Sequence, residues 1–389
     1  MAVLHFERVT LPAYKPKVAS AMLLVLAFAS IVIPQFIVHV SGVSSIELSP
    51  TSTAIGRAVR WLAANQSADG SYGAYLEHET AAAAYAMWLN NSASLSAARA
   101  FSVISSKLYS SSSWFWPPDG EADVAGAMLY SLAASHHLDL VNVNSVSARL
   151  LEFQQPDGGF KGYAPAPDYI SASSSVDTAL ALWALAGSSS ISSQNRIAAV
   201  GYLLRLQNGD GSFNLTSKAY SSNSTDALGP EPLSVTAMVV LALKAVAYNA
   251  SETQVSKALD FLTASISKNF TAASDHKGHV YAASLSAIAL ATFGRTSQAD
   301  DAVAFILSQQ DSDGGFRDIA RGSSGSNALD TGWAAIALEQ VQSGPLFGPP
   351  LAPILFVGII IAVGVVAVAG VVVVYLLLKR RVDKRPLNS

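Results

Sequence analysis

The sequence predicts an all-α fold in which six helical hairpins, twelve helices in two concentric layers, close into a ring. Three observations predict this fold. A short motif that runs from glutamine through Asp-Gly to an aromatic residue occurs four times. The copies are 89, 52 and 103 residues apart, which leaves room for six hairpins of equal size. The second helix of each pair is rich in Ala and Leu and carries few charges, which is typical of a buried helix.

The repeated motif predicts a tight turn between two helices. Its copies are QSADGSY at 66–72, QPDGGF at 155–160, QNGDGSF at 207–213 and QDSDGGF at 310–316. Asp bonds its own backbone and Gly accepts positive φ, so the pair favours a turn that the aromatic residue then covers. We expect the Gln amide to tie this turn to the helix end. The buried face of that helix is marked four residues before each Gln by Leu62, Leu151, Leu203 and Ile306.

The hairpins are expected, in chain order, at about 55–90, 94–138, 145–187, 195–247, 253–293 and 299–342. The second has a degenerate turn, Trp114 to Gly120, and the fifth lacks the motif. The first helix of each pair carries charged residues on one face, so we assign it to the outer layer. The second helix is assigned to the inner layer.

Two uncharged stretches flank the ring. The 389 residues are 51% hydrophobic and only 13% charged, which indicates membrane segments. Residues 18–40 and 354–378 are each long enough to cross a hydrocarbon core of about 30 Å. We predict a transmembrane helix at 354–378, preceded by a Pro-rich linker at 343–353. Residues 18–40 are predicted to be a signal anchor or a cleaved signal peptide.

The charge distribution predicts the topology. Residues 1–17 have a net charge of +2 and residues 379–389 a net charge of +4, which leaves −9 of the total of −3 for the segment between them. Basic flanks stay in the cytoplasm. We therefore expect both tails to be cytoplasmic and the ring, residues 50–342, to lie outside the cell, anchored to the membrane.

Sequons and composition narrow the class of partner. Glycosylation sequons, all in the predicted outer segment, begin at Asn65, Asn90, Asn214, Asn223, Asn249 and Asn269, and they indicate a cell-surface glycoprotein. An acidic outer domain argues against a nucleic-acid partner. The absence of cysteine excludes disulfides, thiolate metal sites and cysteine nucleophiles.

Four acids occupy the same position in the predicted inner helices, just before the small-residue run: Glu79, Asp123, Asp177 and Asp330. Parallel inner helices would bring these acids to one rim of the ring, near His78. One interpretation is helix capping, in which an acid satisfies free N–H groups. The other is a catalytic or ligand-facing cluster in which like charges raise pKa values toward the range useful for acid–base chemistry. Both stay open, and all five residues are catalytic candidates.

Aromatic residues are the candidates for ligand binding. Tyr85, Trp183 and Trp333 lie on predicted inner helices, where core packing is the alternative role. Trp114 and Trp116 lie in the degenerate turn and could form a lip for a sugar or a lipid.

No metal site and no cofactor is predicted. Asp275, His276 and His279 share a loop, but two histidines without a further ligand are a weak zinc signal. Asp311 and Asp313 have the spacing of a calcium loop without its later ligands, so turn chemistry explains them better.

The motif turns resemble the QW-type repeats of the squalene–hopene cyclase and prenyltransferase superfamily, and residues 176–180 resemble the start of an inner helix there. The resemblance covers residues 50–342 and implies an α/α toroid. Similar rings also occur in cobalamin carriers, complement-type thioester domains and polysaccharide-degrading enzymes. Class II terpene cyclases of this superfamily use a D-x-D-D-T-A motif whose third residue donates the proton. Val176 stands at that position here, and Leu329 stands at the equivalent position of the sixth hairpin. The cysteine that prenyltransferases and thioester domains need is also missing.

These departures favour a non-catalytic surface module whose cavity or rim binds a ligand or a surface protein. The alternative is a terpenoid-cyclase-like or polysaccharide-degrading enzyme that uses the rim acids. A deep apolar cavity would indicate isoprenoid or lipid chemistry, and a shallow acidic groove would indicate carbohydrate or peptide binding. A filled centre would indicate an interaction scaffold.

Overall fold

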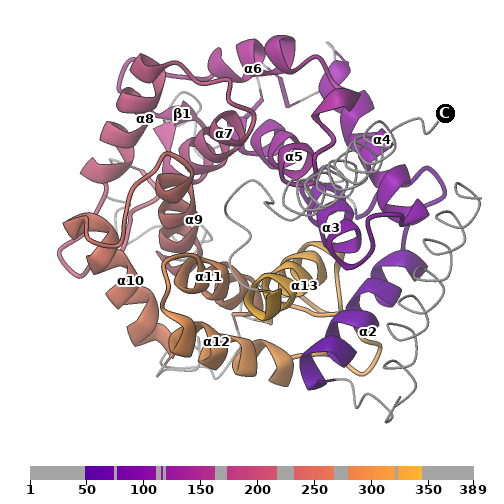
Figure 1. The fold of residues 1–389 in the computed structure, drawn as a ribbon. Coiled ribbons are helices and arrows are strands. Elements are labelled where there is room, and N and C mark those ends of the chain that lie inside the picture. The colour runs from indigo at the N-terminus through magenta and orange to yellow at the C-terminus, as the bar shows by residue number, and fades with distance from the viewer. Residues whose placement is uncertain are drawn as a thin grey trace, which may run out of the picture. The chain divides into compact units, whose positions relative to one another are not determined.

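The computed structural model describes residues 49–73, 77–110, 115–116, 120–162, 173–216, 232–266, 279–319 and 323–343, and in them twelve α-helices form a closed ring of two layers (Figure 1). The outer layer consists of α2 (Pro50–Ala64), α4 (Leu95–Tyr109), α6 (Val143–Leu151), α8 (Ser193–Arg205), α10 (Thr253–Ile266) and α12 (Thr296–Ser308). The inner layer consists of α3 (Glu77–Asn90), α5 (Ala122–Ala134), α7 (Ser175–Gly187), α9 (Pro232–Ala245), α11 (Val280–Thr292) and α13 (Ala328–Ser343). The all-α ring of six hairpins is thus confirmed.

Short elements complete the described part of the chain. A 3-10 turn, η1 (Leu138–Leu140), precedes α6. Two strands of two residues each, β1 (Phe160–Lys161) and β2 (Ser173–Ser174), pair antiparallel before α7.

The inner helices form a continuous ring because each contacts both of its neighbours, and α13 returns to α3. Small residues allow this close packing. A β-carbon on Gly126 of α5 would lie 2.9 Å from the carbonyl carbon of Leu180 in α7, and one on Gly332 of α13 would lie 2.9 Å from that of Ala82 in α3. The early turns of neighbouring inner helices meet at both places, so these helices run parallel.

Each motif copy forms the expected turn. The Asp carboxylate accepts the N–H group two residues later at 2.9–3.0 Å, and the following Gly has φ between 91° and 96°. These pairs are Asp69–Gly70, Asp157–Gly158, Asp210–Gly211 and Asp313–Gly314. The aromatic side chains are at most 1% exposed, as predicted for residues that cover the joint: Tyr72, Phe160, Phe213 and Phe316.

The motif Gln joins neighbouring hairpins. Its Nε2 donates to the carbonyl of the turn Gly and to a carbonyl near the start of the next outer helix, at 2.7–3.1 Å. The glutamines and their partners in the next outer helix are Gln66 with Ser96, Gln154 with Asn195, Gln207 with Gln254, and Gln310 with Ala54. The last bond connects the sixth hairpin to the first and so closes the ring.

The third motif copy begins one residue earlier than predicted. Gln154, not Gln155, makes the two bonds, because only a Gln four residues before the turn Gly spans the turn. The buried residue of the preceding helix is accordingly Leu150 and not Leu151, which is half-buried.

A threonine in the first turn of the inner helix fixes each motif turn to that helix. Its Oγ1 accepts the N–H group of the motif aromatic at 2.8–3.0 Å. The four threonines are Thr80, Thr178, Thr236 and Thr331. This contact satisfies a buried backbone donor and sets the height of the turn along the inner helix.

Within the described residues, no helix combines the length and hydrophobicity needed to cross a bilayer. The predicted spans at 18–40 and 354–378 lie outside the described residues, as do the two tails and the linker after Ser343. The spans, the tails and the linker stay predictions.

Candidate functional site

Aromatic side chains from four inner helices meet at the ring axis. Tyr130 of α5 lies with its ring centroid 3.9 Å from that of Trp183 of α7 and 6.4 Å from that of Trp333 of α13. Trp183 and Trp333 themselves are 6.2 Å apart, although α7 and α13 stand on opposite sides of the ring (Figure 1). Tyr85 of α3 packs edge-on against Tyr130 at 5.8 Å. All four side chains are buried, so aromatic packing extends across the ring axis.

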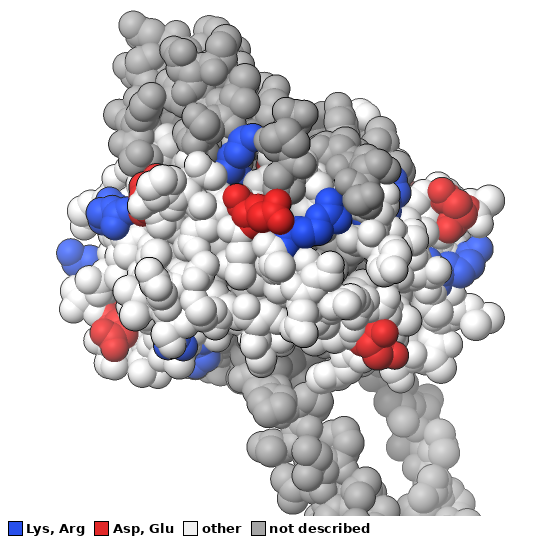
Figure 2. Space-filling model, turned by 90° about the horizontal axis from the view of Figure 1, so that it is seen from above, with Lys and Arg blue, Asp and Glu red and all other residues white. Residues whose placement is uncertain are grey.

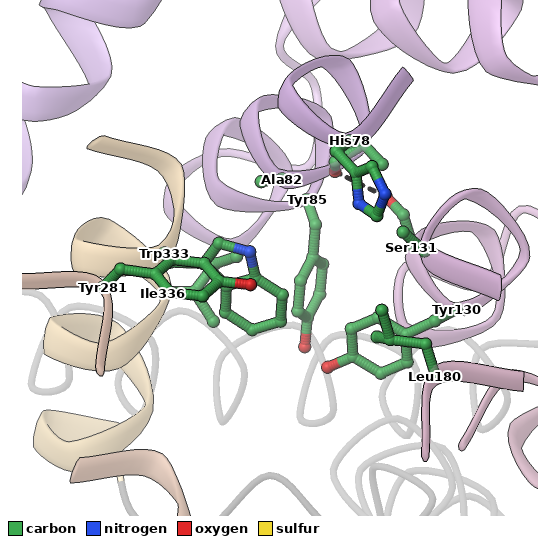
Figure 3. A pocket seen from close by; sticks show the side chains of 11 residues that line it. His78, Ala82, Tyr85, Tyr130, Ser131, Leu180, Tyr281, Trp333 and Ile336 are labelled. Atoms are coloured by element: carbon green, nitrogen blue, oxygen red, sulfur yellow. Dashed lines mark hydrogen bonds between the residues drawn. The ribbon is translucent and has the colours of Figure 1, made fainter. Parts of the chain in front are cut away.

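A small pocket lies beside this cluster (Figure 3). Its walls include His78, Tyr85, Tyr130, Ser131, Tyr281 and Trp333. Its free volume is about 20 Å³, which is room for about one water molecule. Sites for drug-sized ligands usually measure about 300–1,000 Å³. This pocket is therefore too small for an isoprenoid chain or a sugar unit.

A hydrogen-bond chain crosses the pocket wall. The Nε2 of Gln340 donates to the Tyr85 hydroxyl at 3.1 Å, and the hydroxyls of Tyr85 and Tyr130 point toward one another (Figure 3). Burial raises the pKa of Tyr85 to about 12 and the pKa of Tyr130 well above its usual value of 10. Both phenols stay neutral at physiological pH, so they serve as hydrogen-bonding groups and not as bases.

The rim above the pocket brings three of the predicted residues together. His78 Nε2 lies 3.1 Å from Asp123 Oδ2. The backbone N–H of Asp123 donates to Asp177 Oδ1 at 2.9 Å, and the Ser174 hydroxyl donates to Asp177 Oδ2 at 2.6 Å. Asp177 is buried, whereas the side chains of His78 and Asp123 are 30% and 18% exposed. Solvent therefore reaches the group from the side of His78 and Asp123.

The electrostatics of this group favour the protonated imidazole. Burial alone would lower the pKa of His78, but the charge and the hydrogen bond of Asp123, with the charges of Glu121 and Glu77, raise it above 6.5. Burial, together with the charge of Asp123, raises the pKa of Asp177 well above 3.8. The arrangement can thus hold an imidazolium–carboxylate pair beside a carboxyl group that keeps its proton more readily than usual.

The other two predicted acids lie elsewhere on the rim. Asp330 is fully buried and its Oδ2 accepts the N–H group of Asp318 at 2.8 Å. Asp318 is buried as well, and its Oδ2 accepts the N–H group of Tyr281 in the first turn of α11 at 3.0 Å. Glu79 lies against Gly73, because a β-carbon added to Gly73 would overlap the Glu79 carboxylate. Asp330 therefore belongs to a second acidic group, with Asp318.

Trp116 packs in the core and not at an exposed lip. It is 2% exposed, with the Arg149 guanidinium 4.0 Å from its ring centroid and Phe153 stacked at 6.4 Å. Phe115 beside it is fully buried. Trp114 lies outside the described residues.

The described part of the chain contains no group of three or more His, Cys, Asp or Glu side chains that could hold a metal ion. His279 is buried at the start of α11, and Asp275 and His276 lie outside the described residues. Asp313 accepts bonds from Gly315, Ser326 and Trp61, which is the turn role that its spacing indicated.

Sequence reasoning missed two features of this region. The first is Asp318, which stands two positions after the motif aromatic and donates its N–H group to Asp330. Gly162 takes the same place in the third turn, where it lies against Asp177. The bond from Gln340 to Tyr85 was also missed, because it joins residues 255 positions apart.

Comparison with known proteins supports the fold. Residues 134–316 match the family model of the A-macroglobulin TED domain. The type II terpene cyclase MstE from Scytonema is 16% identical over 76% of this chain and 99% of its own, with a TM-score of 0.55. A protein from Actinoplanes is 17% identical over 75% and 99%, with a TM-score of 0.57, and a wild-type glycosidase is 14% identical over 78% and 99%, with a TM-score of 0.54. No curated protein matches the sequence. Together with the closed double ring of helices, these matches show that the chain has the α/α-toroid fold.

Proposed function

We propose that this protein is a non-catalytic toroid module, anchored in the membrane and exposed at the cell surface, that binds a protein partner. The observation that carries the proposal is the aromatic packing across the ring axis. Trp183 and Trp333 meet across the ring axis, and the pocket beside them has room for about one water molecule. Aromatic packing across the axis favours binding at the rims and the outer wall over binding in the ring centre.

The charge and composition of the chain support a protein partner. On the side wall seen in Figure 2, acidic and basic side chains are interspersed among broad uncharged areas. That pattern suits a protein surface better than a nucleic acid, which selects for a basic stripe. The segment between the predicted spans carries a net charge of −9 and all six sequons, which supports a glycosylated extracellular domain.

The chain differs from a thioester domain in one respect that limits how it could bind a partner. Thioester domains need a cysteine, and this chain has none. The toroid would therefore bind its partner without forming a thioester-derived covalent bond.

An enzymatic function is the second candidate, favoured by one observation. His78 lines the pocket, and its pairing with Asp123 favours the protonated imidazole. His78 could therefore donate the proton that a cyclase acid would donate from the position of Val176. The structural neighbours include terpene cyclases and a glycosidase, which shows that the fold accommodates such chemistry in those proteins.

Ligand binding to the ring centre distinguishes the two functions. The full chain in lipid nanodiscs would be incubated with geranylgeranyl isoprenoids and with oligosaccharides, followed by tryptophan fluorescence and by mass spectrometry of products. We expect neither binding nor turnover for the wild type. Trp333→Ala should gain binding of indole, because it opens a space of that shape, whereas Trp88→Ala, at a half-buried position, should not. Turnover by the wild type that Asp123→Asn abolishes would refute the non-catalytic function.

A further inference from the structure

Both ends of the ring leave from the same rim. Gln342, next to the last residue of α13, donates through Nε2 to the Ser52 hydroxyl in the first turn of α2 at 3.0 Å. Since α13 is an inner helix and the inner helices run parallel, this contact lies where all the inner helices end. We call that side the C-terminal rim. The opposite side, where the inner helices begin and where His78 and Asp123 lie, is the N-terminal rim.

We propose that the C-terminal rim is the surface of the toroid that faces the lipid bilayer, so that the N-terminal rim points away from the membrane. This inference rests on the proposed membrane anchoring. The predicted spans connect to the ring through residues 41–49 and 344–353, and both of these segments join the ring at the C-terminal rim.

The lengths of these two segments favour this orientation. Fully extended, each segment reaches at most about 30–35 Å. The inner helices, such as the 16-residue α13, make the ring about 20–24 Å high. In the opposite orientation both segments would have to run along this height before they reached the bilayer, which would leave about 10 Å of slack. In the proposed orientation each connects directly.

Exposed apolar side chains occur at both rims, with Tyr109 and Ile319 at the N-terminal rim and two leucines at the C-terminal rim. Leu95, the first residue of α4, is 82% exposed, and Leu140 of η1 is 44% exposed. They lie at the α3–α4 and α5–α6 connections, which are adjacent on the C-terminal rim. The two leucines can lie at a membrane interface, but the orientation rests on the chain connections alone.

The orientation has a consequence for recognition. His78 and Asp123, the solvent-reachable members of the rim group, lie on the side turned away from the bilayer. A partner from outside the cell would meet this face first.

The absence of cysteine allows a direct test, because any single cysteine introduced into the full chain is the only one. Ser92→Cys, in the α3–α4 connection, marks the C-terminal rim. Ser324→Cys, in the segment before α13, marks the N-terminal rim, and both serines are exposed. Each variant would carry a donor fluorophore in nanodiscs that contain a headgroup-labelled acceptor lipid. We expect higher energy transfer from position 92, because the two labels differ in height by about 20 Å.

Co-elution of the chain with the nanodiscs separates the two proposals. If the chain co-elutes and transfer from position 324 equals or exceeds that from position 92, the orientation is overturned while the anchoring stands. If the chain does not co-elute with lipid, the anchoring fails and the orientation falls with it. Circular dichroism of both labelled variants checks that the helices are intact.

Discussion

Replacing Gln154 by alanine should destabilise the ring far more than replacing its neighbour Gln155. The Gln154 amide makes three bonds. Nε2 donates to the carbonyls of Gly158 and Asn195 at 3.0 Å each, and Oε1 accepts from Asn195 Nδ2 at 2.7 Å. The Gln155 amide donates through Nε2 to the carbonyl of Phe153 at 2.9 Å. The two residues differ in what they join, because Gln154 connects two hairpins and Gln155 stays within one.

The expected size of the difference follows from these bonds. Each hydrogen bond contributes about 0.5–1.5 kcal/mol net. Because the bonds of Gln154 are only partly buried, we expect Gln154→Ala to lower the free energy of unfolding by about 2–3 kcal/mol. Gln155→Ala should lower it by about 1 kcal/mol or less. At about 2–4 °C per kcal/mol, Gln154→Ala should lower Tm by about 4–12 °C.

Thermal and urea unfolding of the full chain, followed by far-UV circular dichroism, would measure both variants. The m-value should stay unchanged if only stability is altered. Equal losses in the two variants, or a larger loss in Gln155→Ala, would refute the assignment of the inter-hairpin bond to Gln154.

Two further predictions concern the turn and the rim. Gly158→Ala should cost about 2–3 kcal/mol, because φ there is +91° and the new β-carbon would lie 2.4 Å from the Ala198 carbonyl oxygen. Gly209→Ala, which meets nothing within 4 Å, should change stability by about 0.5 kcal/mol at most; similar losses in both variants in urea unfolding would contradict this account. Since the folded pKa of His78 is raised above 6.5, the stabilisation by its pairing with Asp123 is fully present below pH 6.5 and is lost as pH rises through the folded pKa. Tm measured across pH should therefore show His78→Gln less stable than the wild type at low pH, with the gap closing at higher pH; a gap that does not depend on pH would contradict the ion pair.

The parts of the fold that obey local rules could be predicted from the sequence. An Asp-Gly pair before an aromatic residue specifies a turn wherever it occurs, and charge on one helix face separates outer from inner helices. The register of the third turn follows from spacing once the copies are compared. In the other three copies the Gln stands four residues before the turn Gly, and Gln154, not Gln155, keeps that spacing. The bond from Gln154 to Asn195 could not be predicted, because it joins residues 41 positions apart.

The centre of the ring lay beyond sequence reasoning for a related reason. Tyr130 and Trp183 were recognisable as aromatic residues on inner helices, but such residues can either line a cavity or fill it. Which of the two occurs depends on side-chain directions and on helix spacing across the ring. Gly126 and Gly332 let the inner helices approach closely, and this narrow ring leaves the rings of Trp183 and Trp333 in contact.

The rim acids can now be divided by what their oxygens bind. Asp177 accepts the N–H group of Asp123 at the start of α5, and Asp318 accepts that of Tyr281 at the start of α11. Asp177 of α7 therefore caps the start of α5, and Asp318, in the segment before α13, caps the start of α11. Both contacts stabilise the N-terminal ends of neighbouring inner helices. A buried carboxylate held in this way is a structural group first. Recognition at this rim would then fall to His78 and Asp123, whose side chains solvent reaches and whose pairing changes with pH.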